Sequence, residues 1–128
     1  MGMEKKKVMV VDDEEDFLKI AKINLEQTGR YEVAAVSDAS VIVSQVKSFR
    51  PDIILLDILM PKTGGAEACK MLNEDPEAKQ IPVVVVSALD TENDRRVMKK
   101  LGVVDFIVKP IEKGELISRI EKVLQGRG

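Results

Sequence analysis

The sequence is poor in features that would assign it to a specialised class of protein. Its single cysteine, Cys69, cannot form an internal disulfide, which suits a reducing compartment. No apolar run reaches the roughly 18 residues that span a bilayer, and the first residues lack the apolar stretch of a signal peptide. The net charge of −2 provides no basic footprint for nucleic acid. We therefore expect a cytoplasmic protein without a membrane or direct nucleic-acid partner.

The composition that is present matches one small globular domain. The 128 residues are 45% hydrophobic and 33% charged, so the chain can bury a core. The sequence contains no repeats, low-complexity tracts or internal linkers. We expect a single domain over residues 1–128, with a core from about 6 to 125 and a fraying tail at 126–128.

Short apolar runs alternate five times with amphipathic segments. Helical spacing follows each run and is most regular near the C-terminus, where Leu116 and Ile120 lie four residues apart. Pro51 and Gly102 are typical of helix ends. The pattern predicts an α/β fold of the (βα)5 type with a parallel sheet. The expected strands are residues 7–11, 32–36, 53–56, 83–86 and 105–108.

Four of the five apolar runs end in polar residues. In a parallel sheet with helical crossovers, the C-terminal ends of all strands lie at one edge, where ligands bind. We therefore expect these residues to converge on one pocket, although nearly a hundred positions separate the first from the last. The runs are VMVV before Asp12 and Asp13, IILL before Asp57, VVVV before Ser87 and Ala88, and FIV before Lys109 and Pro110.

The residue types at these ends suit phosphate chemistry with a magnesium ion. Asp57, a lone acid after IILL, is the candidate nucleophile, whose carboxylate would attack a phosphoryl group and become an acyl phosphate. Asp12 and Asp13 bring two more carboxylates, and three together repel unless a cation binds. Mg²⁺ prefers oxygen ligands and bridges carboxylates to phosphate. Taken singly, Asp12 and Asp13 could cap a helix, Ser87 could stabilise a turn, and Lys109 could be a surface lysine.

These residues resemble those of the receiver domain of response regulators. The resemblance also includes the Met60-Pro61 turn, Gly65 beyond it, and Phe106 ahead of Lys109. The resemblance covers Lys6 to about Gln125. It implies a flavodoxin-like three-layer sandwich with strand order 2-1-3-4-5. It also implies a phosphoacceptor rather than an enzyme, charged by a sensor histidine kinase or a histidine phosphotransfer protein in a two-component relay.

The resemblance also implies a role for each site residue. Asp57 accepts the phosphoryl group, while Lys109 and Ser87 each bind one of its oxygens. Mg²⁺ is held by the side chains of Asp12, Asp13 and Asp57 and by the backbone carbonyl of Leu59. Ser87 and Phe106 form the switch pair, which acts on the face made by the fourth helix, fifth strand and fifth helix.

That face carries charges that could join two copies of the chain. Its basic residues could meet acids of a second copy in a symmetric homodimer, although a solvated charged helix is the plainer interpretation. The fourth helix is also unusual, because two arginines stand where inward-facing residues are expected and leave chiefly Val97, Met98 and Leu101 to pack. The charged residues are Arg95, Arg96, Lys99 and Lys100, opposed by Asp105 and Glu112.

Three other functions remain open on the sequence. A phosphohydrolase of the haloacid-dehalogenase type would have a second Asp two residues after the nucleophile, where this chain has Leu59. Leu59 and Leu89 would do little to position an attacking water, so we expect a long-lived phosphoryl group. An interaction module independent of phosphorylation would typically lose one of the site residues, and this chain keeps them all. The chain could also be the receiver of a larger regulator or hybrid kinase.

Overall fold

A computed structural model describes residues 4–60, 63–88 and 90–126, so Pro61 and Leu89 of the sequence analysis lie outside the described residues. The five strands form one parallel sheet in the order β2-β1-β3-β4-β5, which confirms the expected topology. The strands are β1 (Lys6–Val11), β2 (Tyr31–Val36), β3 (Ile53–Leu56), β4 (Val83–Ser87) and β5 (Asp105–Val108). The helices are α1 (Glu15–Glu26), α2 (Ile42–Phe49), α3 (Gly65–Glu74), α4 (Glu92–Lys100) and α5 (Lys113–Gln125), with short 3-10 turns at Ala39–Val41 and Ala78–Gln80.

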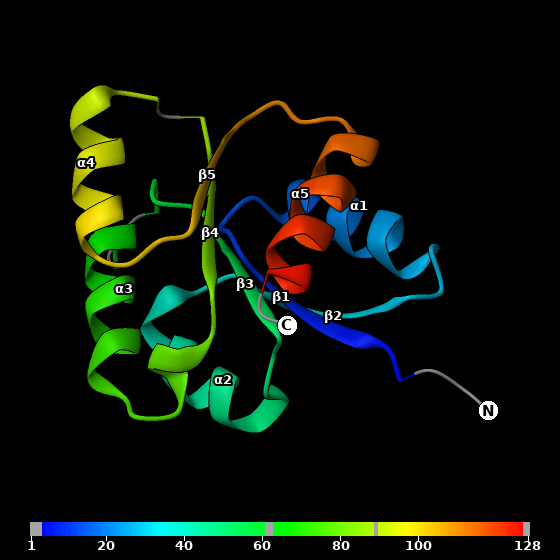
Figure 1. Cartoon of the computed structure of the whole chain (residues 1–128), viewed down its shortest axis with the longest axis horizontal. Coiled ribbons are helices and arrows are strands. Elements are labelled where there is room, and N and C mark those ends of the chain that lie inside the picture. Colours follow the sequence, from blue (N-terminus) through cyan, green and yellow to red (C-terminus); the bar gives the residue numbers. More distant parts are fainter. Residues whose placement is uncertain (1–3, 61–62, 89, 127–128) are drawn as a thin grey trace.

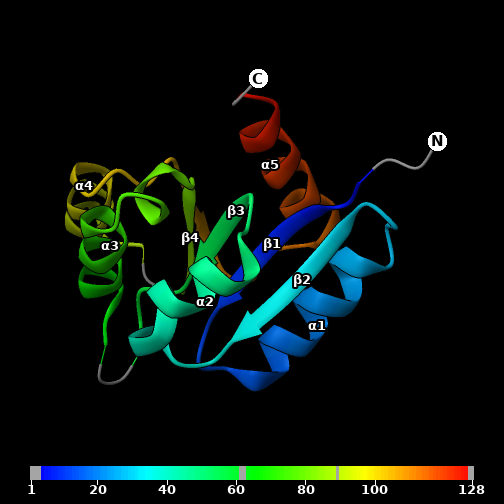
Figure 2. The same cartoon turned by 90° about the horizontal axis from the view of Figure 1, so that it is seen from below.

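The helices form two layers, one on each face of the sheet. Helices α2, α3 and α4 cover one face, and α1 and α5 cover the other (Figures 1 and 2). Alternate residues of β1 therefore enter different cores: Val8 and Val10 pack with α1 and α5, whereas Met9 and Val11 pack on the opposite face. Burial on both faces explains why the inner strands are continuous apolar runs. Within the described ranges, no helix is long and apolar enough to cross a membrane.

The predicted apolar faces of most helices are buried. In α1 these residues are Leu18, Ala21 and Leu25. Cys69 in α3 is 2% exposed, and burial raises the pKa of its thiol to about 11, so it is a core residue with an unreactive thiol.

The prediction for α4 was partly wrong. Met98 is its only fully buried residue, and Val97, which we expected to pack, is 38% exposed. Arg95 and Arg96 are exposed beside it. The helix therefore contacts the sheet through a narrow apolar face, because charged residues occupy most of its positions.

The strand register places the C-terminal residues of the strands side by side. Val11 pairs with Leu56 across β1 and β3, so Asp12 and Asp57 follow as neighbours. The backbone pairing continues past the strands: the Asp57 N–H donates to the Val11 carbonyl at 3.0 Å, and the Lys109 N–H donates to the Ser87 carbonyl at 2.8 Å. The residues that follow the inner strands are thus fixed by the sheet itself.

A glycine closes the loop between β3 and α3. A Cβ atom at Gly65 would lie 2.6 Å from the Cα of Ile58, and the Gly65 N–H donates to the Ile58 carbonyl at 3.3 Å. Only glycine allows the start of α3 to approach this closely. The contact holds the segment after Asp57 against the sheet edge.

Candidate functional site

The structure brings the predicted acids together at the C-terminal edge of the sheet. Asp12 and Asp57 are 0% and 5% exposed, whereas Asp13 is open to solvent. One carboxylate oxygen from each of the three lies within 4.8 Å of the others. This donor set consists of hard oxygen atoms with one exposed member, which suits a divalent cation such as Mg²⁺ that retains some of its waters.

The environment of Asp57 shows why a cation would be favourable there. Burial raises the pKa of the Asp57 carboxyl, and the negative charge of Asp12 adds to the shift. Hydrogen bonds with the Leu59 backbone and the Ser87 side chain, and the charge of Lys109, oppose it. The Leu59 N–H donates to Asp57 Oδ1 at 3.0 Å. The net rise means that the buried negative charge is incompletely compensated by the protein.

Lys109 is the residue that follows β5, and its side chain extends toward the same acids. Its ammonium lies 2.6 Å from Asp12 Oδ2, 2.7 Å from Glu14 Oε1 and 4.0 Å from Asp57 Oδ2. The ring centroid of Phe17 is 4.2 Å away, a cation–π distance. Burial disfavours the charged ammonium, but the hydrogen bonds to Asp12 and Glu14 outweigh it and raise the pKa of Lys109. Lys109 therefore lies within the candidate site and is not an ordinary surface lysine.

Two of these contacts were missed in the sequence analysis. Glu14 and Phe17 both belong to the segment from the end of β1 into α1, and both contact Lys109. The acidic run Asp12-Asp13-Glu14-Glu15 contained a signal for Glu14, but the run alone does not show which acid turns toward the pocket. The capping alternative for Asp12 is wrong: its Oδ1 accepts the Glu14 N–H at 2.9 Å, but Glu14 precedes α1, and among the described residues no side chain caps the start of that helix.

Phe106 occupies the middle of the α4–β5–α5 face. Strand β5 is the edge strand, with α4 and α5 on either side of it (Figure 1). The Phe106 ring is 9% exposed and packs in the core beside Met98, and the Arg95 guanidinium covers it at 4.7 Å from the ring centroid. Arg95 Nε also donates to Asp90 at 2.6 Å. The aromatic ring is thus buried beneath an exposed cation.

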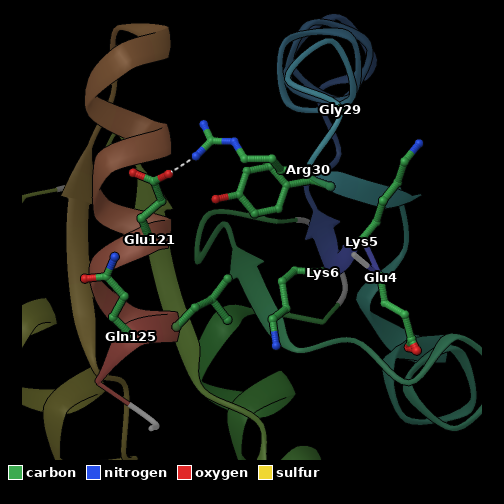
Figure 3. Close-up of a pocket in the computed structure, with 9 residues that line it drawn as sticks. Glu4, Lys5, Lys6, Gly29, Arg30, Glu121 and Gln125 are labelled. Carbon is green, nitrogen blue, oxygen red and sulfur yellow. Dashed lines mark hydrogen bonds and ion pairs between the residues drawn. The ribbon is translucent and has the colours of Figure 1, made fainter. Parts of the chain in front are cut away.

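A separate pocket lies at the opposite, N-terminal edge of the sheet. It has a volume of about 260 Å³ and is lined by residues from the start of β1, the turn before β2 and the end of α5 (Figure 3). An ion pair between Arg30 and Glu121 connects the turn before β2 to α5 at this pocket. None of the predicted site residues lines this pocket, so we place the candidate site at the C-terminal edge.

The strand order β2-β1-β3-β4-β5 places the protein among α/β proteins with the flavodoxin-like fold. Acids, a hydroxyl and a lysine lie at the C-terminal edge of its sheet. Residues 8–121 match the model of the response regulator receiver domain. The chain belongs to this family, whose members are the receivers of two-component systems.

Comparisons with individual proteins agree with this assignment. The chain is 34% identical over 120 residues to the alkaline phosphatase synthesis transcriptional regulatory protein PhoP of Bacillus subtilis, covering 94% of this chain and 49% of PhoP. It is 36% identical over 119 residues to the response regulator PleD of Caulobacter vibrioides, covering 91% of this chain and 26% of PleD. The chain therefore spans at most about half the length of these relatives.

Solved structures show the same fold. The chemotaxis protein CheY4 of Vibrio cholerae superposes with a TM-score of 0.88 at 24% identity, covering 94% of this chain and 99% of that protein. The receiver domain of a signal transduction histidine kinase from Syntrophus aciditrophicus has a TM-score of 0.83 at 30% identity, with 94% and 91% covered.

Proposed function

We propose that the chain is a phosphoacceptor in a two-component relay, which receives a phosphoryl group on Asp57 from a histidine kinase or a histidine phosphotransfer protein. The observation that carries this proposal is the geometry around Asp57. Three carboxylates lie within 4.8 Å of one another, and an ammonium lies 4.0 Å from the Asp57 carboxylate. Such a site can accept an anionic group only if cations offset its charge.

The chemistry follows from the groups present. A carboxylate oxygen of Asp57 attacks phosphorus, the bond from phosphorus to the donor nitrogen breaks, and the departing imidazole keeps the electron pair. Lys109 and Ser87 each donate a hydrogen bond to a phosphoryl oxygen. Mg²⁺, held by Asp12, Asp13, Asp57 and the Leu59 carbonyl, would supply positive charge for the transferred group. The pocket thus stabilises charge and positions the donor, and the carboxylate forms the new bond.

Phosphorylation would be transmitted through Ser87 and Phe106. A phosphoryl oxygen that draws the Ser87 hydroxyl toward it would change the packing around Phe106, in the adjacent strand. The structure has the ring buried, which is the position that we associate with signalling. We therefore infer a pre-existing equilibrium between a buried and an outward position of the Phe106 ring. Phosphorylation favours the buried position, and the outward position loses the contact with Arg95. A shift from 1:99 to 99:1 would require about 5.5 kcal/mol of differential stabilisation.

The α4–β5–α5 face is the proposed contact surface for a protein partner or a second copy. Hollows of about 200 and 460 Å³ flank Phe106, and Arg95 borders both. Asp105 is engaged within the chain by Arg119, whereas Glu112 is exposed. A symmetric dimer would therefore pair the basic residues of α4 with Glu112 rather than with Asp105.

The decisive experiment measures intact mass after incubation with acetyl phosphate, with and without Mg²⁺. We expect the parent to gain one phosphoryl group only with Mg²⁺, and Asp57→Asn to gain none. Asp16→Asn, which removes an exposed acid of α1, serves as the matched control and should behave as the parent. No gain in the parent would favour the interaction module, and steady release of phosphate without accumulation would favour the phosphohydrolase.

A further inference from the structure

We propose that Glu14 is a rate-setting residue that competes with the incoming phosphoryl group for the ammonium of Lys109. This inference rests on the proposed function, because it concerns how quickly Asp57 is phosphorylated. Glu14 belongs neither to the three-carboxylate cluster nor to the phosphoryl-binding groups named above. Its carboxylate nevertheless lies 2.7 Å from the lysine on which phosphoryl binding depends.

The position of Glu14 is fixed by its backbone. Its N–H donates to Asp12 Oδ1 at 2.9 Å, while Asp12 Oδ2 lies 2.6 Å from Lys109. Asp12, Glu14 and Lys109 therefore form a closed ring of hydrogen bonds. Glu14 is also the residue that precedes α1, but its side chain caps no backbone group that the structure describes. The carboxylate is directed to Lys109 instead of to the start of the helix.

The ring of hydrogen bonds limits what Lys109 can offer to a phosphoryl group. An ammonium has three N–H donors, and Asp12 and Glu14 accept two of them. The Phe17 ring lies on the same β1–α1 side, 4.2 Å from the ammonium. These contacts hold the ammonium of Lys109 on the side of β1 and α1. Its nitrogen lies 4.0 Å from Asp57 Oδ2, farther than from either Asp12 or Glu14. One N–H donor is left for a phosphoryl oxygen, and a closer approach of Lys109 to Asp57 would work against its contacts with Glu14 and Phe17.

The negative charge of Glu14 also opposes the binding of an anionic phosphoryl group. Three carboxylates, Lys109 and one divalent cation sum to zero, and Glu14 makes the sum −1 before any phosphoryl group arrives. The side chain of Glu14 is 64% exposed, so water and salt screen its effect. An exposed ion pair contributes up to about 1 kcal/mol, which corresponds to about a two- to fivefold change in rate. Glu14 therefore slows phosphorylation moderately without preventing it.

The test is the rate of phosphoryl incorporation, measured by intact mass at saturating Mg²⁺ for the parent, Glu14→Gln, Glu14→Asp and Glu15→Gln. Glu15 is the matched control, since it is the next residue and its substitution changes the net charge equally. We expect Glu14→Gln to be about two- to fivefold faster than the parent at low salt, and Glu15→Gln to match the parent. Glu14→Asp, which keeps the charge but shortens the reach, should lie between Glu14→Gln and the parent.

Two further readouts separate competition from a structural effect. The gain in Glu14→Gln should be larger with acetyl phosphate, a dianion, than with phosphoramidate, a monoanion at neutral pH, and it should shrink as salt rises. Equal or slower phosphorylation of Glu14→Gln, or the same gain in Glu15→Gln, would overturn the inference while leaving the proposed function intact. A parent that gains no phosphoryl group from either donor would remove both.

Discussion

The two edges of the sheet differ in how their charged side chains are buried and paired. At the C-terminal edge, Asp12 and Asp57 are buried, and Lys109 faces more carboxylates than it can neutralise. At the N-terminal edge, Arg30 and Glu121 form a balanced pair with 52% and 35% of their side chains exposed. Buried charges lower stability unless they are paired, whereas exposed pairs have little effect in either direction. The C-terminal edge therefore carries uncompensated negative charge, which a bound cation would offset.

The sharpest way to test this contrast is to remove one cation from each edge. We expect Lys109→Met to lower the free energy of unfolding by about 3 kcal/mol, because it leaves the fully buried Asp12 without its partner. Arg30→Met should lower it by less than about 1 kcal/mol. Urea unfolding followed by far-UV circular dichroism is suitable, since the chain has no tryptophan.

A double variant serves as the control for the Lys109 result. Combining Asp12→Asn with Lys109→Met removes both members of the Asp12–Lys109 ion pair, so it should recover a substantial part of the lost stability. If the double variant is less stable than Lys109→Met alone, the lysine contributes through packing, and the contrast between the edges is not electrostatic.

Neutralising Asp57, the proposed nucleophile, should stabilise the protein in the absence of metal. The pKa of Asp57 is raised by burial and by Asp12, so its ionisation opposes folding as the pH rises through the folded pKa. At neutral pH we expect Asp57→Asn to raise the free energy of unfolding by roughly 1 kcal/mol in EDTA. The advantage should disappear below the unfolded pKa, near 3.8.

Magnesium should reverse the order of the two proteins. A cation that binds only the folded parent stabilises it by mass action, and Asp57→Asn loses one of the proposed ligands. Saturating Mg²⁺ should therefore raise the unfolding midpoint of the parent above that of Asp57→Asn. If Asp57→Asn is less stable than the parent in EDTA at neutral pH, the ionised Asp57 carboxylate does not destabilise the fold.

The sequence predicted the C-terminal edge far better than it predicted the surroundings. Asp12, Asp57, Ser87 and Lys109 could be placed because each follows an apolar run, and the parallel topology converts that position into proximity. Glu14 and Phe17 could not, since the contacts of a side chain at the start of a helix depend on the loop geometry and on the position of Lys109. The α4 helix was misjudged at Val97 for a related reason: charged side chains obscure which narrow face meets the sheet.

An ion pair of intermediate burial at the N-terminal edge provides the last and smallest test. Asp105 begins β5, and Arg119 of α5 donates to its two carboxylate oxygens at 2.8 and 2.9 Å. This hydrogen bonding lowers the pKa of Asp105, so its contribution to stability is present above the unfolded pKa near 3.8 and is lost as the pH falls through the folded pKa. We expect Asp105→Asn to lower the free energy of unfolding at pH 7 by about 1 kcal/mol. The urea midpoints of the parent and the variant should draw together as the pH falls from 7 toward the folded pKa, whereas a difference that does not change with pH would mean that the pair acts through packing.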